Sequence, residues 1–307
     1  MNVREKIKII QNLSGLTQTE LATKLGVTFA SLNRWVNDKA KPRKKIEEKL
    51  NLLYLEYSGE KQIPETELAA KKLIIFKKQK NCLNPMETIL DSPDIYEKFQ
   101  LTLTYNSNRI EGSTLSENET EDILFNNITL PNKTLTEQLE AKNHQTAIKY
   151  LFQHLSENKS VDEKLILKLH EILMNSIRQD AGIYRNHPVR ILGSNVPTSN
   201  YLKIPELMKS LSKKLSTNKE DIISHITYVH YNFEQIHPFS DGNGRIGRLL
   251  IHAMLLKKNF PPAVIKQETK RLYITYLNAA QLKNNPYLLE NFLCDAVMEG
   301  YKILERK

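Results

Sequence analysis

The 307-residue chain has few cysteines, few glycines and no long apolar run. Its two cysteines, Cys82 and Cys294, are too few for a disulfide framework or a cysteine-based zinc site. No apolar stretch reaches the roughly 18 residues of a membrane-spanning helix, and the first residues lack the apolar core and cleavage site of a signal peptide. We therefore expect a cytoplasmic protein with no membrane partner.

Glycine accounts for only 10 of the 307 residues, about 3% where about 7% is usual. This scarcity, with abundant Leu, Ile, Lys and Glu, predicts a mostly helical protein. Three of the glycines (Gly242, Gly244 and Gly247) fall within six residues, which marks that segment as a candidate binding loop. The length predicts two or three domains at roughly 100–200 residues each.

The formal net charge of +9 is concentrated near the N-terminus. Residues 1–57 carry 11 basic and 6 acidic side chains, whereas the other 250 residues carry 33 and 29. Such an excess favours a polyanionic partner for the N-terminal segment. A charge that serves only solubility would look the same, so charge alone leaves both readings open.

The first 45 residues predict three short helices. Residues 3–13 have apolar side chains at helical spacing, Thr17 and Glu20 form a capping box for a second helix, and Gly26 ends it. Thr28 can cap a third helix. Two helices joined by a short glycine-containing turn are the sequence form of a helix-turn-helix, and the basic residues that follow can contact phosphates.

The segment from Gln18 to Pro42 resembles the repressor-type helix-turn-helix domains of the Cro/C1 class. The resemblance implies DNA as a partner, and a homodimer stays open because such modules bind palindromic sites. A helical bundle that binds protein is the alternative. Asn33 and Arg34 are the strong base readers by chemistry. The expected DNA-contacting residues are Gln18, Thr28, Asn33, Arg34 and Lys44.

A polar break at residues 57–60, followed by Pro64, is the best domain boundary. We expect a helix-turn-helix domain at 1–57, a linker with connecting helices at 58–100 and a second domain at 101–307. Helical patterns cover 65–80, 94–106, 116–128, 134–156, 161–178 and 204–216. Residues 188–198 instead predict a small β-hairpin. The expected fold is therefore all-α with one hairpin.

Residues 222–256 carry the clearest chemistry. Apolar spacing predicts a buried helix over 222–236 and a second one after Arg245, joined by a glycine-rich loop. The glycines let a ligand approach the backbone, and the following helix offers amides and the positive end of its dipole to an anion. Arg245 and Arg248 share one helix face and can bind phosphate oxygens.

Two further loop residues extend this anion site to a reaction. Asp241 would repel a phosphate, so its presence favours a bridging Mg²⁺. His237 is a natural proton acceptor near neutral pH. Together with the arginines, these residues fit nucleotidyl or phosphoryl transfer.

Two other interpretations fit less well. The three clustered glycines have the dinucleotide-binding spacing, but that fingerprint requires a preceding strand and here a helix precedes it. His225, His230 and His237, with His252 beyond, suggest a metal cluster, but their spacing fits no zinc signature.

Residues 237–248 match the Fic signature, HxFx(D/E)GNGRxxR, at every fixed position. The resemblance to the Fic family extends from about residue 100 to 300, through Gly182-Ile183-Tyr184-Arg185 and Pro261-Pro262. It implies a helical domain with a hairpin, called the flap, and transfer of AMP from Mg²⁺-ATP to a Ser, Thr or Tyr hydroxyl of a target protein.

The same resemblance implies a role for each motif residue. His237 would deprotonate the target hydroxyl, Phe239 would anchor the loop, and Asp241 would bind Mg²⁺ between the α- and β-phosphates. Arg245 and Arg248 would bind the β- and γ-phosphates. The phosphate cradle would comprise Gly242, Asn243 and Gly244, and the adenine site Tyr273, Leu277 and Gln281. The flap around Ile191 would pair with the backbone of the target.

Ser107 to Gly112 match the inhibitory pattern of the family, [ST]xxxE[GN]. By resemblance, Glu111 pairs with Arg248 and holds the enzyme off. The alternative is a helix that ends at Gly112 with Glu111 in solvent. The sequence thus predicts an autoinhibited protein AMP-transferase. Two alternatives are removal of AMP through a water that Glu111 positions, and a DNA-binding regulator with a nucleotide-responsive Fic part. Relatives that transfer UMP, phosphate or phosphocholine leave the transferred group open as well.

Overall fold

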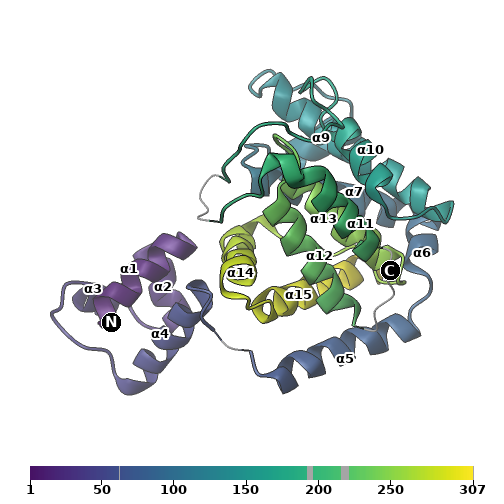
Figure 1. The fold of residues 1–307 in the computed structure, drawn as a ribbon. Coiled ribbons are helices and arrows are strands. Elements are labelled where there is room, and N and C mark those ends of the chain that lie inside the picture. Colours follow the sequence, from purple (N-terminus) through teal and green to yellow (C-terminus); the bar gives the residue numbers. More distant parts are fainter. Residues whose placement is uncertain (62, 192–195, 216–220, 307) are drawn as a thin grey trace. The chain divides into compact units, whose positions relative to one another are not determined.

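The computed structural model describes residues 1–61, 63–191, 196–215 and 221–306. Two compact units are present (Figure 1): Met1–Pro64 with Glu268–Leu289, and Glu65–Gln267 with Glu290–Lys307. All regular elements within the described ranges are helices. The mostly helical fold predicted from the scarcity of glycine is confirmed.

Helices α1 (Val3–Ser14), α2 (Gln18–Leu25), α3 (Phe29–Val36) and α4 (Lys44–Tyr57) form the N-terminal part of the first unit. The Thr17–Glu20 capping box and the Thr28 cap are both present, and Gly26 adopts the left-handed conformation with φ 73°. These features confirm the predicted helix boundaries. The helices enclose a hydrophobic core of Ile7, Ile10, Leu21, Ala22, Leu25, Leu32, Trp35, Leu50 and Tyr57.

Helix α14 (Lys270–Lys283) belongs to the same unit although it is far away in the sequence. Leu272 packs against the hydrophobic core, and Arg271 Nη1 donates to the Asn12 carbonyl at 3.0 Å. Gly15, with φ 70°, lies next to Arg271. A Cβ at this position would overlap the Arg271 guanidinium. The helix-turn-helix therefore completes its fold with a helix from the C-terminal third of the chain.

Helix α13 lies at the centre of the second unit. It packs against α7, α9, α10 and α12, and its residues from Arg245 to Leu256 are all buried. Helix α13 spans Asn243–Leu256, and the other α-helices of this unit are α5 (Glu65–Asn81), α6 (Pro85–Asp91), α7 (Pro93–Glu111), α8 (Glu117–Leu124), α9 (Leu135–Ser156), α10 (Glu163–Leu173), α11 (Ile204–Leu215), α12 (Ile222–Ile236) and α15 (Tyr287–Leu304). This packing fixes the start of α13, where the signature lies.

Several predicted elements differ from the structure, among them the helix predicted at 116–128, which ends at Leu124. Helix α7 continues to Glu111 instead of ending near 106, because the buried polar residues Asn106, Ser107 and Asn108 interrupt the apolar pattern. Helix α10 ends at Leu173, short of 178. The hairpin predicted at 188–198 is not shown: residues 188–191 and 196–198 contain no strand, and 192–195 lie outside the described residues.

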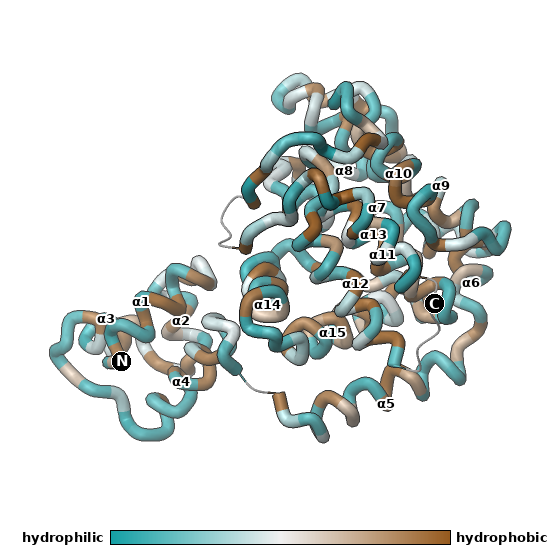
Figure 2. Tube along the Cα trace, viewed as in Figure 1, coloured by the Kyte–Doolittle hydropathy of each residue, from teal (hydrophilic) through white to brown (hydrophobic). Residues whose placement is uncertain are grey.

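Hydrophobic and hydrophilic residues are interspersed along α5, the lysine-rich helix predicted at 65–80 (Figure 2). Within the described ranges, no helix combines the length and the low polarity that crossing a bilayer requires.

Candidate active site

The motif loop, residues 237–242, joins α12 to α13. Helix α12 ends at His237, which has φ 51° and donates its amide to the Phe233 carbonyl at 2.9 Å. The Asn243 side chain closes the loop, because its oxygen accepts from the Phe239 amide and its nitrogen donates to the Phe239 carbonyl, both at 2.9 Å. Asn243 thus shapes the predicted cradle from within.

His170 on α10 packs against the motif loop and forms a hydrogen bond with it. Its ring stacks on the fully buried Phe239 at 3.7 Å between centroids. Its Nδ1 accepts from the Gly182 amide at 2.8 Å, so Nε2 carries the proton and donates to the Asp241 carbonyl at 3.1 Å. Burial lowers the pKa of His170 to about 4, which keeps the ring neutral.

Sequence reasoning missed His170. Its place between the apolar residues of α10 made it look like part of an ordinary helix face. The only signal was that the segment from Gly182 to Arg185, part of the resemblance to the Fic family, had no assigned contact with the signature.

Arg185 ties the loop to the segment that leads into the predicted flap. Its guanidinium is buried and donates to the carbonyls of His237, His187 and Ser199, each at 2.7 Å. Its amide donates to the Pro238 carbonyl at 2.9 Å. Ile191 lies in this segment, outside any regular element. The backbone on both sides of the predicted target-binding residue is thereby fixed to the motif loop.

His237 is oriented for proton transfer. Its Nδ1 lies 3.2 Å from the Glu234 carbonyl, and donation there leaves Nε2 as the basic nitrogen. Burial lowers the pKa of His237, and the charge of Arg185 acts in the same direction, while the Glu234 hydrogen bond, Glu111 and Asp241 oppose the shift. The net effect favours the neutral imidazole that a general base requires.

The carboxylate of Glu111, at the end of α7, lies against the first turn of α13. Arg248 Nη2 lies 2.7 Å from Glu111 Oε1, and the guanidinium also donates to the Ser107 hydroxyl at 2.9 Å and the Ser107 carbonyl at 3.0 Å. A Cβ on Gly244 would overlap Glu111 Oε1. Glu111 therefore occupies the position where the helix N-terminus and Arg248 would otherwise receive an anion.

Arg245 stands in the first turn because α13 begins at Asn243, three residues earlier than predicted. Its side chain is 2% exposed and contacts two carboxylates: Nη1 lies 2.6 Å from Glu140 Oε1, and Nη2 lies 3.5 Å from Asp241 Oδ1. Asp241 is 53% exposed, and the same oxygen accepts from the Gly242 amide at 2.6 Å. One exposed carboxylate beside groups that are predicted to bind phosphate fits Mg²⁺, which proteins often hold through one carboxylate and the substrate phosphates.

The titratable side chains buried around α13 other than the two arginines are mostly uncharged. Burial lowers the pKa of His230 and of His252 to about 3, and lowers the pKa of His144 as well, with Arg248 adding to each shift. Burial raises the pKa of Glu234 to about 8, so this carboxyl is mainly neutral at pH 7. In the part of the chain that the structure describes, no three His, Cys, Asp or Glu side chains are arranged to hold a metal ion.

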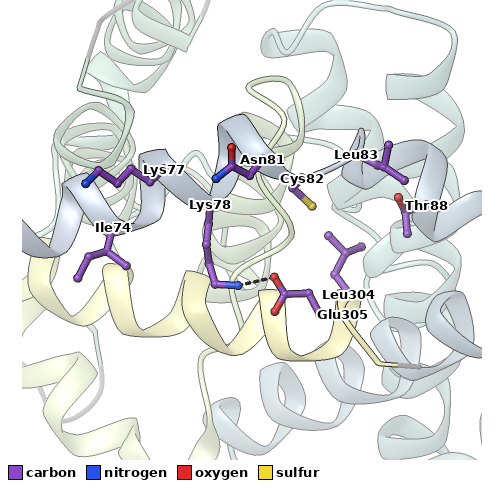
Figure 3. Close-up of a pocket in the computed structure, with 9 residues that line it drawn as sticks. All are labelled: Ile74, Lys77, Lys78, Asn81, Cys82, Leu83, Thr88, Leu304 and Glu305. Carbon is purple, nitrogen blue, oxygen red and sulfur yellow. Dashed lines mark hydrogen bonds and ion pairs between the residues drawn. The ribbon is translucent and has the colours of Figure 1, made fainter.

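A cavity of about 510 Å³ lies elsewhere in the second unit, between α5 and the end of α15 (Figure 3). Its lining includes Cys82, Leu83 and the ion pair of Lys78 with Glu305. None of the signature residues lines it, so this cavity does not mark the predicted nucleotide site.

The remaining predicted site residues lie in the first unit. Tyr273 and Leu277 are buried on α14, one turn apart, and Gln281 follows one turn later. Their place beside adenine stays a prediction. At the helix-turn-helix, Thr28, Arg34 and Lys44 are exposed, and Asn33 Nδ2 donates to Gln18 Oε1 at 3.3 Å.

Comparison with known families gives two matches. Residues 160–255 match the Fic/DOC family, and residues 7–50 match the helix-turn-helix family. The protein adenylyltransferase Fic of Nematostella vectensis is 32% identical over 183 residues, 57% of this chain and 42% of the relative. The protein of the same name from Aedes aegypti is 31% identical over 181 residues, 57% of this chain and 36% of the relative. The chain thus matches about two-fifths of the length of these relatives.

Solved structures show the same fold. A Fic domain-containing signalling protein from Bacteroides thetaiotaomicron has a TM-score of 0.64 at 25% identity, covering 76% of this chain and 97% of that one. Fic-1 from C. elegans has a TM-score of 0.63 at 20% identity, covering 97% of this chain and 96% of that one.

Proposed function

We propose, from the premise that the chain contains a Fic/DOC-family domain behind an N-terminal helix-turn-helix, that it transfers AMP from ATP to a Ser, Thr or Tyr hydroxyl of a target protein. The observation that carries this proposal is the motif loop, which combines a half-buried, oriented imidazole with a candidate anion site flanked by two buried arginines. The curated relatives with this domain are named protein adenylyltransferases.

In this proposal His237 Nε2 accepts the proton of the target hydroxyl as that oxygen attacks the α-phosphorus. Arg245 and Arg248 bind the β- and γ-phosphates and balance the charge of the departing pyrophosphate. Asp241 would hold Mg²⁺, which would supply positive charge against the phosphates. Gly242 and Gly244 keep the loop backbone accessible to the phosphates, and Asn243 holds the loop closed.

The resting state is proposed to be inhibited. Glu111 pairs with Arg248 and lies against Gly244, so its carboxylate occupies the place of the γ-phosphate. ATP then loses one arginine and meets a like charge, which disfavours the productive phosphate arrangement. Ser107, the first residue of the inhibitory pattern, adds two contacts that keep Arg248 in this position.

Recognition of adenine and of the target is proposed from the resemblance. Tyr273, Leu277 and Gln281 form one ladder of α14 at i, i+4 spacing, suited to line one side of a base. The segment around Ile191 would pair with the backbone of the target. Arg185 supports this role because it fixes the segment to the carbonyl of His237.

The lowered pKa of His237 predicts a shifted pH profile. The neutral imidazole is the active form, so in a Glu111→Gly protein the acidic limb of kcat/KM for AMP transfer should have an apparent pKa below the usual ~6.5. The measurement is the initial rate of labelling between about pH 4.5 and 8.5, chosen as about two units on either side of that value. A limb centred above it would contradict the role of burial.

The proposed activity is tested by incubating Glu111→Gly protein with a cell lysate and radiolabelled ATP, followed by mass spectrometry of the labelled proteins. AMP on a hydroxyl side chain supports the proposal. Competition with UTP and CDP-choline identifies the transferred group. Absence of label from all nucleotides would refute transferase activity.

A second function, DNA binding, is favoured by the helix-turn-helix match and by the exposed basic residues. We propose that α3 enters the major groove with Arg34 and Asn33 reading bases, while Gln18, Thr28 and Lys44 contact the backbone. Binding of DNA from upstream of its own gene would let one unit regulate synthesis of the other.

Two variants separate these contacts. Arg34→Ala should weaken binding roughly 10- to 100-fold and relax base preference, whereas Lys44→Ala should weaken all sequences alike and reduce the salt slope by about one. Fluorescence anisotropy at several salt concentrations measures both effects. Lys209→Ala on α11, an exposed lysine of the second unit, is the matched control. Equal affinity of all four proteins would exclude this interface.

A further inference from the structure

The shortest ion pair of Arg245 is the one with Glu140 on α9. The distance from Arg245 Nη1 to Glu140 Oε1 is 2.6 Å, whereas Nη2 lies 3.5 Å from Asp241 Oδ1. The Arg245 side chain is 2% exposed, and its buried Nε has no hydrogen-bond partner among the described residues. A charge buried to this extent needs a carboxylate in contact, and Glu140 supplies it.

The part of α9 that carries Glu140 is fixed on both sides. One turn earlier, the Glu137 carboxylate accepts from the Thr114 amide at 2.7 Å and its hydroxyl at 2.8 Å. One turn later, Asn143 donates to the carbonyls of Leu173 at 3.1 Å and Asn175 at 2.8 Å. Glu140 is therefore held in place relative to the loop after α7 and to the end of α10.

Asp241 is the second carboxylate within reach of Arg245. Asp241 precedes Arg245 by four residues in the sequence, and the present distance between their charged atoms is longer than that of a close ion pair. If Glu140 were absent, the buried guanidinium would turn toward Asp241 and form that pair. The proposed Mg²⁺ ligand and the proposed β-phosphate ligand would then neutralise each other.

We propose that Glu140 is a positioning residue that keeps Arg245 and Asp241 apart. By binding Nη1 it orients the guanidinium so that Nη2 faces the phosphates, and it leaves the Asp241 carboxylate open to Mg²⁺. Glu140 itself touches no substrate. The inference rests on the proposed function, since it requires a triphosphate in the motif loop.

The test measures nucleotide affinity by calorimetry in the full chain carrying Glu111→Gly. Addition of Glu140→Ala should weaken binding of the non-hydrolysable ATP analogue AMPPNP with Mg²⁺ about tenfold or more, the usual range for residues that orient a ligand-binding group. Binding of AMP should stay the same, because AMP has no β-phosphate. Glu140→Gln keeps the length and one oxygen acceptor, so a smaller loss is expected.

Glu121→Ala is the control, because Glu121 is an exposed glutamate on the neighbouring helix α8. Unchanged AMPPNP binding by both Glu140 variants would overturn the inference. Tighter binding by both would also overturn it, since Glu140 would then act only as a repelling charge. An equal loss of AMP affinity would also overturn it, because that indicates a general structural change. If Glu140→Ala does not fold, Glu140→Gln decides by the same comparison. Failure of the Glu111→Gly parent to bind AMPPNP would refute the proposed function instead.

Discussion

Glu111→Gly should raise the rate of AMP transfer about 100-fold or more. A carboxylate about 4 Å from the γ-phosphate costs about 4 kcal/mol at an effective dielectric of 20. The Glu111 side chain is 38% exposed, so solvent screening reduces this to about 2–3 kcal/mol, which corresponds to roughly 100-fold. The substitution also frees Arg248 and opens the space against Gly244. Incorporation of label from ATP into target protein measures the change.

Glu157→Gly is the matched control, because Glu157 is an exposed glutamate at the end of another helix, α9. It should label at the wild-type rate. Equal labelling by wild-type and Glu111→Gly proteins would refute inhibition by Glu111. Incubation of each variant with AMP-modified target tests the reverse reaction, in which loss of AMP that requires Glu111 would assign this residue to water positioning.

His237→Ala in the Glu111→Gly protein should reduce AMP transfer by about 10²- to 10⁴-fold, the usual contribution of a general base. The residue lies at the end of α12 with its ring oriented by the Glu234 carbonyl, and its side chain makes none of the phosphate contacts. Binding of AMPPNP should therefore stay within a few-fold of the parent. Labelling rates and calorimetry together separate loss of chemistry from loss of binding.

His154→Ala serves as the control for this variant, because His154 lies on α9 and bonds to the Ser160 carbonyl, away from the motif loop. It should retain full activity. If His237→Ala labels its target as fast as its parent, another group must act as the base, and the proposed mechanism is wrong.

Local features of the fold could be predicted because their causes lie within a few residues. The Thr17–Glu20 capping box and the Gly26 turn depend on neighbouring residues alone. The helix over 222–236 has an uninterrupted apolar pattern, and its predicted bounds match α12. The signature loop was recognisable for the same reason, since all of its residues are contiguous.

Distant contacts were not predictable from local patterns, and the Glu111–Arg248 pair was expected only because of the resemblance. The contacts of His170 with Asp241 and of Glu140 with Arg245 join residues 71 and 105 positions apart in the sequence. Helix α7 appeared too short because its last turns bury polar groups, and Ser107 illustrates why: it is inward-facing to bind Arg248. Buried polar residues obscure helical periodicity wherever a functional site replaces the core.

The place of α14 has a consequence for any attempt to study the two halves separately. A fragment starting at residue 65 would retain α14 but lose the hydrophobic core against which Leu272 packs and the Asn12 carbonyl that Arg271 contacts. Leu272 would meet water, and the Arg271 guanidinium would lose its carbonyl acceptor. Deleting the N-terminal segment therefore removes more than the helix-turn-helix: it leaves the helix that bears Tyr273, Leu277 and Gln281 without its scaffold. Altered behaviour of such a truncation would report on this missing support as well as on the loss of the helix-turn-helix.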